Sequence, residues 1–567
     1  MVVKRECILI NKRHNEIRGM RRVKVHEKGS AFFLLVMFLF AISSHLVPDS
    51  VFAATFSVNS ISDGVDANPG DGICATVEGF CTLRAAIMEA NSLAGADTIT
   101  LPAGVYTLAI AGANEDASAT GDLDIIEDIT INGAGSATTT IDGNSLDRVI
   151  DIHSGAVTIS GVTIRGGNPG TGRPGGGIMV STTIAGSLTI LNSTISENRA
   201  ANGGGIYNPG LGLTITNSSI DNNIADVDGG GITNFGFLVM QNSTISNNTA
   251  TSEAGLSHMG TNAASIINST ISGNIATTGG GGGLVINTFG ISTIASTSIV
   301  NNTAALGGGG LYISGTGPVT VANSTISSNT TNCCVAGGIL HSGSGELILR
   351  NSTVSGNTVS NGDAGGIFVS GAGPLTATNT TVSNNIAGNN GGGIFNYGLL
   401  TLTNVTLSRN EASIGGGIYN FTLTGSSILR NTILDNNAGG NCNATITSAG
   451  HNLDSGNSCG FSGPNDLIDT NPLLGPLSNN GGSTLTHALL AGSPAIDAAD
   501  PTTFPATDQR GVTRPQGAGP DIGAYELVPS TATTVSIPTM TEWGLLIFSV
   551  FAGFLSMHHL RKNRLTE

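Results

Sequence analysis

Residues 203–223 read GGGIYNPGLGLTITNSSIDNN, and the chain returns to this pattern many times. Its two constant parts are Gly-Gly-Gly-Ile-Tyr-Asn and, after a variable gap, Asn-Ser-Thr-Ile-Ser-x-Asn. The second part recurs every 25 to 28 residues, with copies that start at Asn192, Asn217, Asn242, Asn268, Ser296, Asn323, Asn351, Asn379, Asn404 and Asn431. A period of this length indicates one supersecondary unit stacked many times.

Each repeat contains three short runs in which apolar and polar residues alternate, at 203–208, 213–217 and 219–223 in the quoted copy. Such runs are typical of strands, and the Asn and Gly residues at their ends tolerate the left-handed backbone of sharp turns. Three strands per long repeat predict one coil of a parallel β-helix, whereas a hairpin meander needs turns at regular short spacing. We therefore expect an all-β chain: a right-handed, single-stranded parallel β-helix (solenoid) with a short N-terminal capping helix, plus a signal peptide and a C-terminal hydrophobic helix.

Two positions of the repeat are expected to stack from coil to coil. One aliphatic side chain per coil should point inward, and burial of each contributes roughly 1.5–3 kcal/mol. These residues are Ile195, Ile220, Ile245, Ile271, Ile299, Ile326, Val354, Val382, Leu407 and Ile433. Asn side chains can hydrogen-bond between coils. We expect such a ladder at Asn198, Asn223, Asn248, Asn274, Asn302, Asn329, Asn357, Asn385, Asn410 and Asn437.

The composition excludes several classes of protein. Of the 567 residues, 82 are Gly, but Gly clusters once per long repeat, which excludes collagen. The formal net charge is −16, and no Lys occurs between Lys28 and Lys562. An acidic surface of this kind repels nucleic acid, so we expect no nucleic-acid partner.

Residues 1–53 have the pattern of a secretory signal with a long basic region. Residues 4–28 are basic, residues 31–42 are apolar, and residues 51–53 offer small residues at the spacing of a cleavage site. A membrane anchor is the alternative, although the apolar run is short for a span. Translation can start at Met1 or at Met20, and the second start gives a signal of ordinary length.

The C-terminus carries a motif, an apolar stretch and a basic tail in that order. The motif residues are Ile537, Pro538, Thr539, Glu542, Trp543 and Gly544. This segment, residues 537–567, resembles the IPTL-CTERM sorting signal of bacterial exported proteins, although Met540 and Thr541 replace its Leu and Ser. The resemblance implies envelope sorting and processing machinery as a partner, with the helix in the inner membrane before any processing. A plain single-pass anchor is the alternative reading, and residues 529–536 form a flexible linker.

Six cysteines follow the signal segment, in three close pairs. An even number in an exported chain suggests disulfides, and we expect the bridges Cys74–Cys81 and Cys442–Cys459. No His or further Cys lies at the spacing of a zinc site, which argues against metal binding by these residues. Cys333 and Cys334 can form a strained vicinal bridge or stay reduced, and the sequence leaves both open.

Two further resemblances bracket the repeats. Residues 74–91, CATVEGFCTLRAAIMEAN, resemble the CSLREA domain that opens many bacterial β-helix proteins, and residues 54–110 form that predicted cap. Leu83, Ala86, Ile87 and Ala90 share one helical face, which predicts a helix over the first coil. Residues 464–528 resemble the choice-of-anchor Q domain of exported β-helix proteins, through stretches such as 492–497 and 520–526. Residues 111–463 are then the β-helix, and their repeats also resemble those of polymorphic outer-membrane proteins.

Candidate chemistry is confined to the variable turns. Many parallel β-helices cleave polysaccharides, and hydrolysis needs two carboxylates on one face. The candidate catalytic residues are Asp226, Asp228, Glu253 and Asp363, for which solvated turn residues are the alternative reading. Lys is absent from the mature chain, so a lysine base is excluded. We expect no cofactor other than Ca²⁺, for which Asp226 and Asp228 are the candidate ligands.

These features predict an exported protein of the cell envelope or cell surface, either retained there or released. Its expected role is structural or adhesive, with the coils displaying their turns to extracellular carbohydrate or to a surface protein. An extracellular polysaccharide lyase or hydrolase, acting through the acidic turns, is the second hypothesis. A matrix component without a specific ligand is the third.

Overall fold

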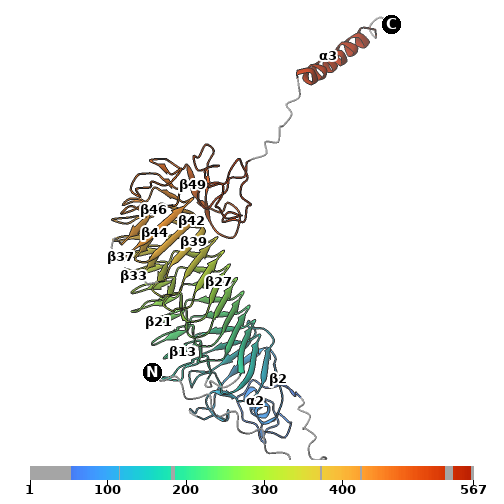
Figure 1. Cartoon of the computed structure of the whole chain (residues 1–567). Helices are drawn as coiled ribbons and strands as arrows, with labels where there is room; N and C mark the ends of the chain where they lie inside the picture. The colour runs from blue at the N-terminus through green and yellow to red at the C-terminus, as the bar shows by residue number, and fades with distance from the viewer. Residues whose placement is uncertain are drawn as a thin grey trace, which may run out of the picture. The chain divides into compact units, whose positions relative to one another are not determined.

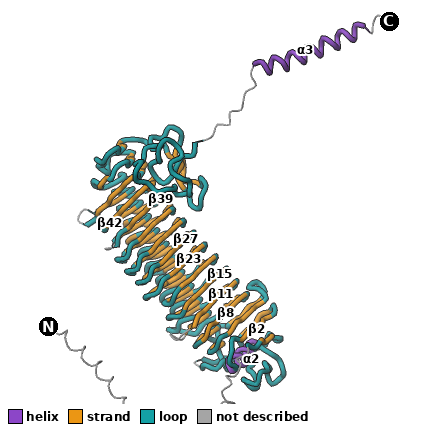
Figure 2. The backbone as a smooth tube through the Cα atoms, turned by 45° about the vertical axis from the view of Figure 1, so that its right-hand side comes forward, coloured by secondary structure: helices purple, strands orange, loops and turns teal. Residues whose placement is uncertain are grey.

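The computed structural model describes residues 53–113, 115–180, 186–370, 373–421, 424–529 and 540–563. Residues 1–52 of the predicted signal (1–53) and the motif residues Ile537, Pro538 and Thr539 lie outside this described part. Strands stack coil upon coil through the repeats, and neighbouring coils pair in parallel (Figures 1 and 2). The fold is a parallel β-helix, as the repeat predicts.

One coil shows how the repeat folds. Its strands are β14 (Ile206–Asn208), β15 (Gly212–Thr216), β16 (Ser219–Asp221) and β17 (Ile224–Ala225). The first belongs to a 12-stranded sheet that runs from β4 (Leu123–Ile125) to β43 (Ile418–Asn420). The next two belong to a 28-stranded sheet, called here the large sheet, and the last to an 8-stranded sheet that runs from β13 (Arg199–Ala200) to β40 (Ile386–Ala387).

The coil has four strands in three sheets, whereas the repeat predicted three strands. The second and third predicted strands share the large sheet, joined by Asn217 with a φ of 49°. The third sheet is built instead by pairs of residues such as Ile224–Ala225, in the segment predicted as a variable turn. Two residues are too few to produce a periodic pattern, so this strand could not be predicted from the repeat.

The aliphatic ladder fills the interior of the coils. Ile195, Ile220 and Ile245 pair in register and are fully buried, and this pattern continues to Leu407. The prediction is wrong for the last member, Ile433. Leu407 pairs instead with Leu434, which takes the inward position. Ile433 pairs with Thr406 at the outward position, where it packs in a separate cluster with residues of the C-terminal region.

The asparagine ladder forms as predicted. From Asn198 to Asn410, each side-chain Nδ2 donates to the Oδ1 of the next Asn at 2.9–3.0 Å. The same oxygen accepts the backbone N–H of the preceding ladder residue, so the side chains satisfy turn groups that would otherwise be buried without a partner. At the C-terminal end Asn437 donates to Asn441, which donates to Asp454.

The Gly triplets lie where two coils approach most closely. A Cβ at Gly204 would lie 2.5 Å from the carbonyl oxygens of Gly230 and Ile224. Only glycine fits at this corner, which explains why the triplet recurs with every coil.

Helix α2 (Leu83–Ser92) covers the first coils. Its predicted face is buried against strands β2 (Asp97–Leu101) and β4, and the Thr82 side chain accepts the backbone N–H of Ala85 at the N-terminus. Arg84 is fully buried, where its guanidinium pairs with Asp63 and donates to three backbone carbonyls of the 118–122 loop. This residue fastens the helix and the following loop together.

The C-terminal end of the chain contains a hairpin and a long helix. Strands β49 (Leu474–Ser478) and β50 (Thr486–Leu489) form an antiparallel pair within the region after the last coil. Helix α3 (Met540–Asn563) includes Gly544–Lys562, a segment long and apolar enough to cross a membrane, with a mean hydropathy of 1.3. The assignment of α3 as a membrane-spanning helix rests on its length and composition. The helix lies where the sequence predicted a C-terminal hydrophobic helix.

Candidate functional site

One face of the large sheet presents the same polar groups on coil after coil. In strands such as β16, β20 (Thr244–Ser246) and β24 (Thr270–Ser272), the first hydroxyl is half-buried and faces outward while the following Ile is buried. The residue two positions before each strand is exposed and has a left-handed backbone conformation, with a φ of 49° to 50°. We call this array the Asn–Thr rail, made of Asn192, Asn217, Asn242, Asn268, Ser296 and Asn323 with Thr194, Ser219, Thr244, Thr270, Ser298 and Thr325.

The backbone preference of Asn explains why the rail forms. Asn adopts the left-handed conformation more readily than most residues, so it bends the strand once per coil and leaves its amide outside. The pairing Thr194–Ser219–Thr244–Thr270 keeps the hydroxyls in register, one per coil. Neighbouring amides also touch, as Asn217 Nδ2 donates to Asn192 Oδ1 at 3.3 Å.

The C-terminal region covers the continuation of this face. Thr353 donates to the carbonyl of Leu485 at 2.6 Å, and Thr381 donates to the side chain of Gln509 at 2.7 Å. Thr353 and Thr381 are fully buried here, whereas the equivalent Thr194 to Thr325 remain half-exposed. The same array is therefore an internal interface at one end and an open surface along the rest.

The asparagines of the covered coils make equivalent contacts. Asn379 Nδ2 donates to the carbonyl of Thr507 at 2.7 Å. Asn404 Nδ2 donates to the carbonyls of Asp521 and Gly523 at 3.1 and 3.2 Å. Asn431 likewise donates to the carbonyl of Thr503 at 3.0 Å. Each coil thus contributes one amide to the docking of the C-terminal region.

The predicted acidic turn residues come together only in part. Asp226 is paired with Arg199 at 2.5 Å on the surface. Burial raises the pKa of Glu253, and the nearby charge of Asp228 raises it further, while the Ser257 hydroxyl donates to the Glu253 carboxylate and lowers it. Burial also raises the pKa of Asp228. Asp228 and Glu253 therefore form one interacting pair on adjacent coils.

Asp363 lies apart from that pair. It ends β37 (Thr358–Asp363), several coils further along the 8-stranded sheet, and accepts both the backbone N–H and the side-chain amide of Asn390. In the described part of the chain, two groups of three side chains could hold a metal ion, and neither includes the predicted Ca²⁺ ligands Asp226 and Asp228.

Those two groups overlap in an acidic cluster that sequence reasoning missed. Asp122, Asp124 and Asp151 are buried with carboxylate oxygens within 4.8 Å of one another, and Arg148 pairs with Asp122 and Asp151. His153 Nε2 lies 3.1 Å from Asp124 Oδ1. The register of β4 and β7 (Ile150–Ile152) pairs Asp124 with Asp151, so coil spacing is the signal that would have found them.

The cluster holds protons near neutral pH. Burial raises the pKa of Asp122 to about 7, with the charge of Asp124 adding to the rise and Arg148 opposing it. Burial also raises the pKa of Asp124, and the hydrogen bond to Asp124 raises the pKa of His153. A carboxyl group with a pKa near 7 can act as a general acid.

The charged residues of the C-terminal region are structural. Arg514 and Glu526 form a fully buried pair at 2.9 Å, and Arg514 also donates to the carbonyls of Asp521 and Gly523. Arg510 pairs with Asp508 at 2.7 Å and covers the Tyr525 ring. These contacts fix the loops that cover the large sheet.

Five aromatic rings gather on the outer side of the 12-stranded sheet, which the low aromatic content did not suggest. Phe368 stacks on Phe395 at 5.1 Å, and Phe395 stacks on Tyr419 at 4.6 Å, while Tyr397 and Phe421 pack over them. Phe368 and Phe395 are 7% and 2% exposed. The cluster packs the coils together, with Phe368 and Phe395 covered by their neighbours and Tyr397, Tyr419 and Phe421 half-exposed.

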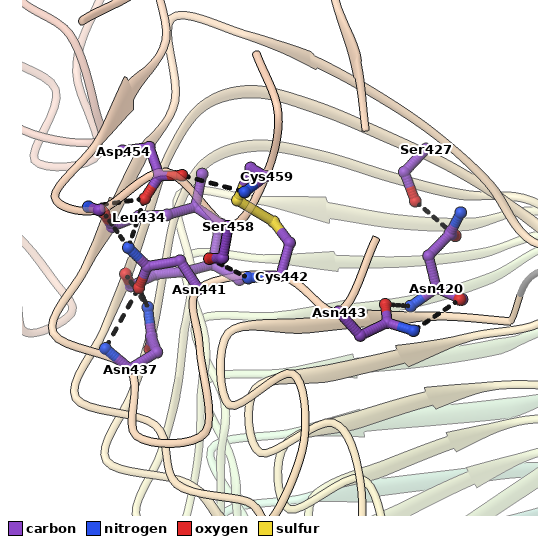
Figure 3. The surroundings of a disulfide bond; sticks show 12 residues. Asn420, Ser427, Leu434, Asn437, Asn441, Cys442, Asn443, Asp454, Ser458 and Cys459 are labelled. Atoms are coloured by element: carbon purple, nitrogen blue, oxygen red, sulfur yellow. Dashed lines mark hydrogen bonds between the residues drawn. A yellow bond between two sulfur atoms is a disulfide. The ribbon is translucent and has the colours of Figure 1, made fainter. Parts of the chain in front are cut away.

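Both predicted disulfides are confirmed. Cys74 joins Cys81 beside the capping helix, and Cys442 joins Cys459 next to the end of the asparagine ladder, as Figure 3 shows. Cys333 and Cys334 have free thiols in this structure, with Cys334 exposed. Each bridge lies at one end of the β-helix, where a coil has a neighbour on one side only.

One family model and two solved structures resemble the chain. A family model described as a right-handed beta helix region matches residues 254–437. The chain is similar to the solved structure titled "Crystal structure of pectate lyase Pel9A", with 14% identity and a TM-score of 0.32 over 84% of this chain and 97% of that one. It is also similar to "The complex structure of XylC with xylose", with 12% identity and a TM-score of 0.30 over 67% of each chain.

No curated protein matches the chain. The family match and the parallel stacking of the coils together make the repeat region a right-handed parallel β-helix.

Proposed function

We propose that the chain is an exported protein of the cell envelope or surface, whose β-helix displays the Asn–Thr rail for adhesion to carbohydrate or to a surface protein. The open rail is the observation that carries the proposal, since it offers exposed amides and half-exposed hydroxyls at the same place on successive coils. Repeat proteins typically bind through such extended faces. The two disulfides and the apolar helix α3 support export and envelope retention.

A polysaccharide-cleaving enzyme is the second candidate function. The specific observation in its favour is the acidic cluster, where Asp122 has a pKa of about 7 beside Asp124 and His153. Against it, Arg148 pairs with Asp122 and Asp151 and occupies part of the cluster. The turn residues Asp226 and Asp363 lie on separate coils and do not complete it.

The test separates the two functions in one assay. The purified protein is incubated with neutral and acidic polysaccharides, with and without Ca²⁺, and both retention on the polymer and new reducing ends are measured. Retention without new ends supports display. New ends that disappear in Asp122→Asn support the enzyme and contradict a purely adhesive role. Failure to bind polysaccharide and intact cells refutes the display proposal.

A further inference from the structure

The Asn–Thr rail continues an interface that the chain already forms with itself. At the covered coils, Asn379 and Asn404 donate their amides to carbonyl oxygens of the C-terminal region, and the Thr381 hydroxyl donates to Gln509. The open coils carry the same groups at the same register, from Thr325 back to Thr194. The covered end therefore shows what this face binds: neutral oxygen acceptors for its amides and hydroxyls, together with donors such as the Gln509 side-chain amide, which donates to the Thr353 hydroxyl at 3.0 Å.

The charge on and around the rail selects against charged polymers. The rail residues are all uncharged, and a carboxylate contacts them at Ser219, whose hydroxyl donates to Asp221 Oδ1 at 3.4 Å. The whole chain has a formal net charge of −16. A polyanion is repelled by this surface, and a polycation finds too few carboxylates along the rail to pair with.

The regular spacing of the rail determines which ligands can contact all of its coils. Successive coils lie about 4.8 Å apart, and five of the six open positions are Asn while the sixth is Ser. The C-terminal region meets its coils with an irregular set of residues, and the single residue Gln509 contacts Thr353 and Thr381 on adjacent coils. A ligand that satisfies all the open coils must instead repeat the same neutral oxygen groups along its length, as an uncharged polysaccharide does with every sugar.

We infer that the open Asn–Thr rail binds a neutral, hydroxylated polysaccharide strand laid along the axis of the β-helix. This inference rests on the proposed display function and names its ligand class. The rail amides donate to hydroxyl and ring oxygens of successive sugars, and the Thr and Ser hydroxyls accept from sugar hydroxyls. No step requires a cofactor or a change in the fold.

The experiment uses the full chain and a matched pair of triple variants. The rail variant carries Asn217→Asp, Asn242→Asp and Asn268→Asp, whereas the control carries the same change at Asn247, Asn301 and Asn384. All six residues are exposed and left-handed, with φ between 49° and 58°, so both variants place three charges at equally strained positions. Circular dichroism and thermal midpoints check that both variants fold.

Retention is measured on cellulose, mannan and starch as neutral polymers and on pectate and alginate as anionic ones. The wild type and the control are expected to bind a neutral polymer equally. The rail variant is expected to lose affinity by about 10-fold or more, since three donated hydrogen bonds are lost. Binding that prefers an anionic polymer contradicts the inference.

Three other outcomes are decisive. Equal retention of the wild type and the rail variant overturns the inference but leaves the display function standing. Self-association in sedimentation that only the rail variant loses, without retention on any polymer, shows that a second copy occupies the rail and also overturns it. Failure of the wild type to bind any polysaccharide or intact cells overturns both the inference and the proposed function.

Discussion

The buried asparagine ladder offers the sharpest test of what stabilises the coils. Asn274 is fully buried, and its side chain joins three coils. Its Oδ1 accepts the backbone N–H and the side-chain N–H of Asn248, both at 3.0 Å. Its Nδ2 donates to Asn302 Oδ1 at 2.9 Å and to the carbonyl of Ile245 at 3.1 Å.

The change Asn274→Ala removes all of these bonds. The backbone N–H of Asn248 and one of its side-chain N–H groups then lack an acceptor inside the protein. Each buried donor left unsatisfied costs about 1–3 kcal/mol, so the free energy of unfolding is expected to fall by about 2–6 kcal/mol. The other N–H of the Asn248 side chain keeps its bond to the carbonyl of Ile220.

Urea unfolding followed by circular dichroism measures this loss. The control is Thr270→Ala on the same coil, where a half-exposed hydroxyl is removed, with an expected change of about 0.5 kcal/mol or less. Because long repeat arrays can unfold in parts, amide hydrogen exchange should also be faster at Asn248 than at Asn329, whose N–H keeps its own acceptor. An Asn274→Ala change no larger than that of the control refutes the reasoning.

Three further perturbations test other parts of the structure. Cys442→Ser opens a loop with a sequence separation of 17 and should cost about 3 kcal/mol, seen as a lower thermal midpoint without reductant. Arg514→Met leaves the Glu526 carboxylate buried and unpaired, which should cost about 3–5 kcal/mol in urea unfolding. The raised pKa of Asp122 means that the native state keeps a proton which the unfolded state has released between pH 3.8 and about 7. Stability should therefore fall across that window by up to about 1.4 kcal/mol per pH unit. Asp122→Asn should flatten this dependence when urea unfolding is repeated at several pH values, whereas Glu78→Gln, at an exposed position, should not.

The fold could be predicted from the repeat because each coil buries the same types of residue against its neighbours at the same positions. The inward aliphatic residue and the Asn ladder were read correctly since both recur at a fixed interval and both have one physical role. The error at Ile433 arose because two aliphatic residues follow each other in this coil, and the one that pairs with Leu407 and points inward is Leu434. The two-residue strands such as Ile224–Ala225 escaped notice because so short a segment has no period of its own.

The candidate sites were harder to predict because they depend on contacts between distant segments. Asp124 and Asp151 meet only when their coils are stacked, and Arg148 and His153 join them from the second coil. The variable turns contain the carboxylates that a hydrolytic site needs. In the structure, however, Asp226 pairs with Arg199, and only Asp228 and Glu253 interact with each other.

The sequence by itself determined the β-helix, its internal ladders and the two disulfides, because local period and spacing dictate which residues stack. Only the tertiary structure decided which part of the outer face is open. Thr353 and Thr194 occupy the same place in the repeat, yet one is buried under the C-terminal region and the other remains half-exposed. A repeat specifies contacts between neighbouring coils, whereas the docking of Gln509 on Thr381 joins residues 128 positions apart and follows no period.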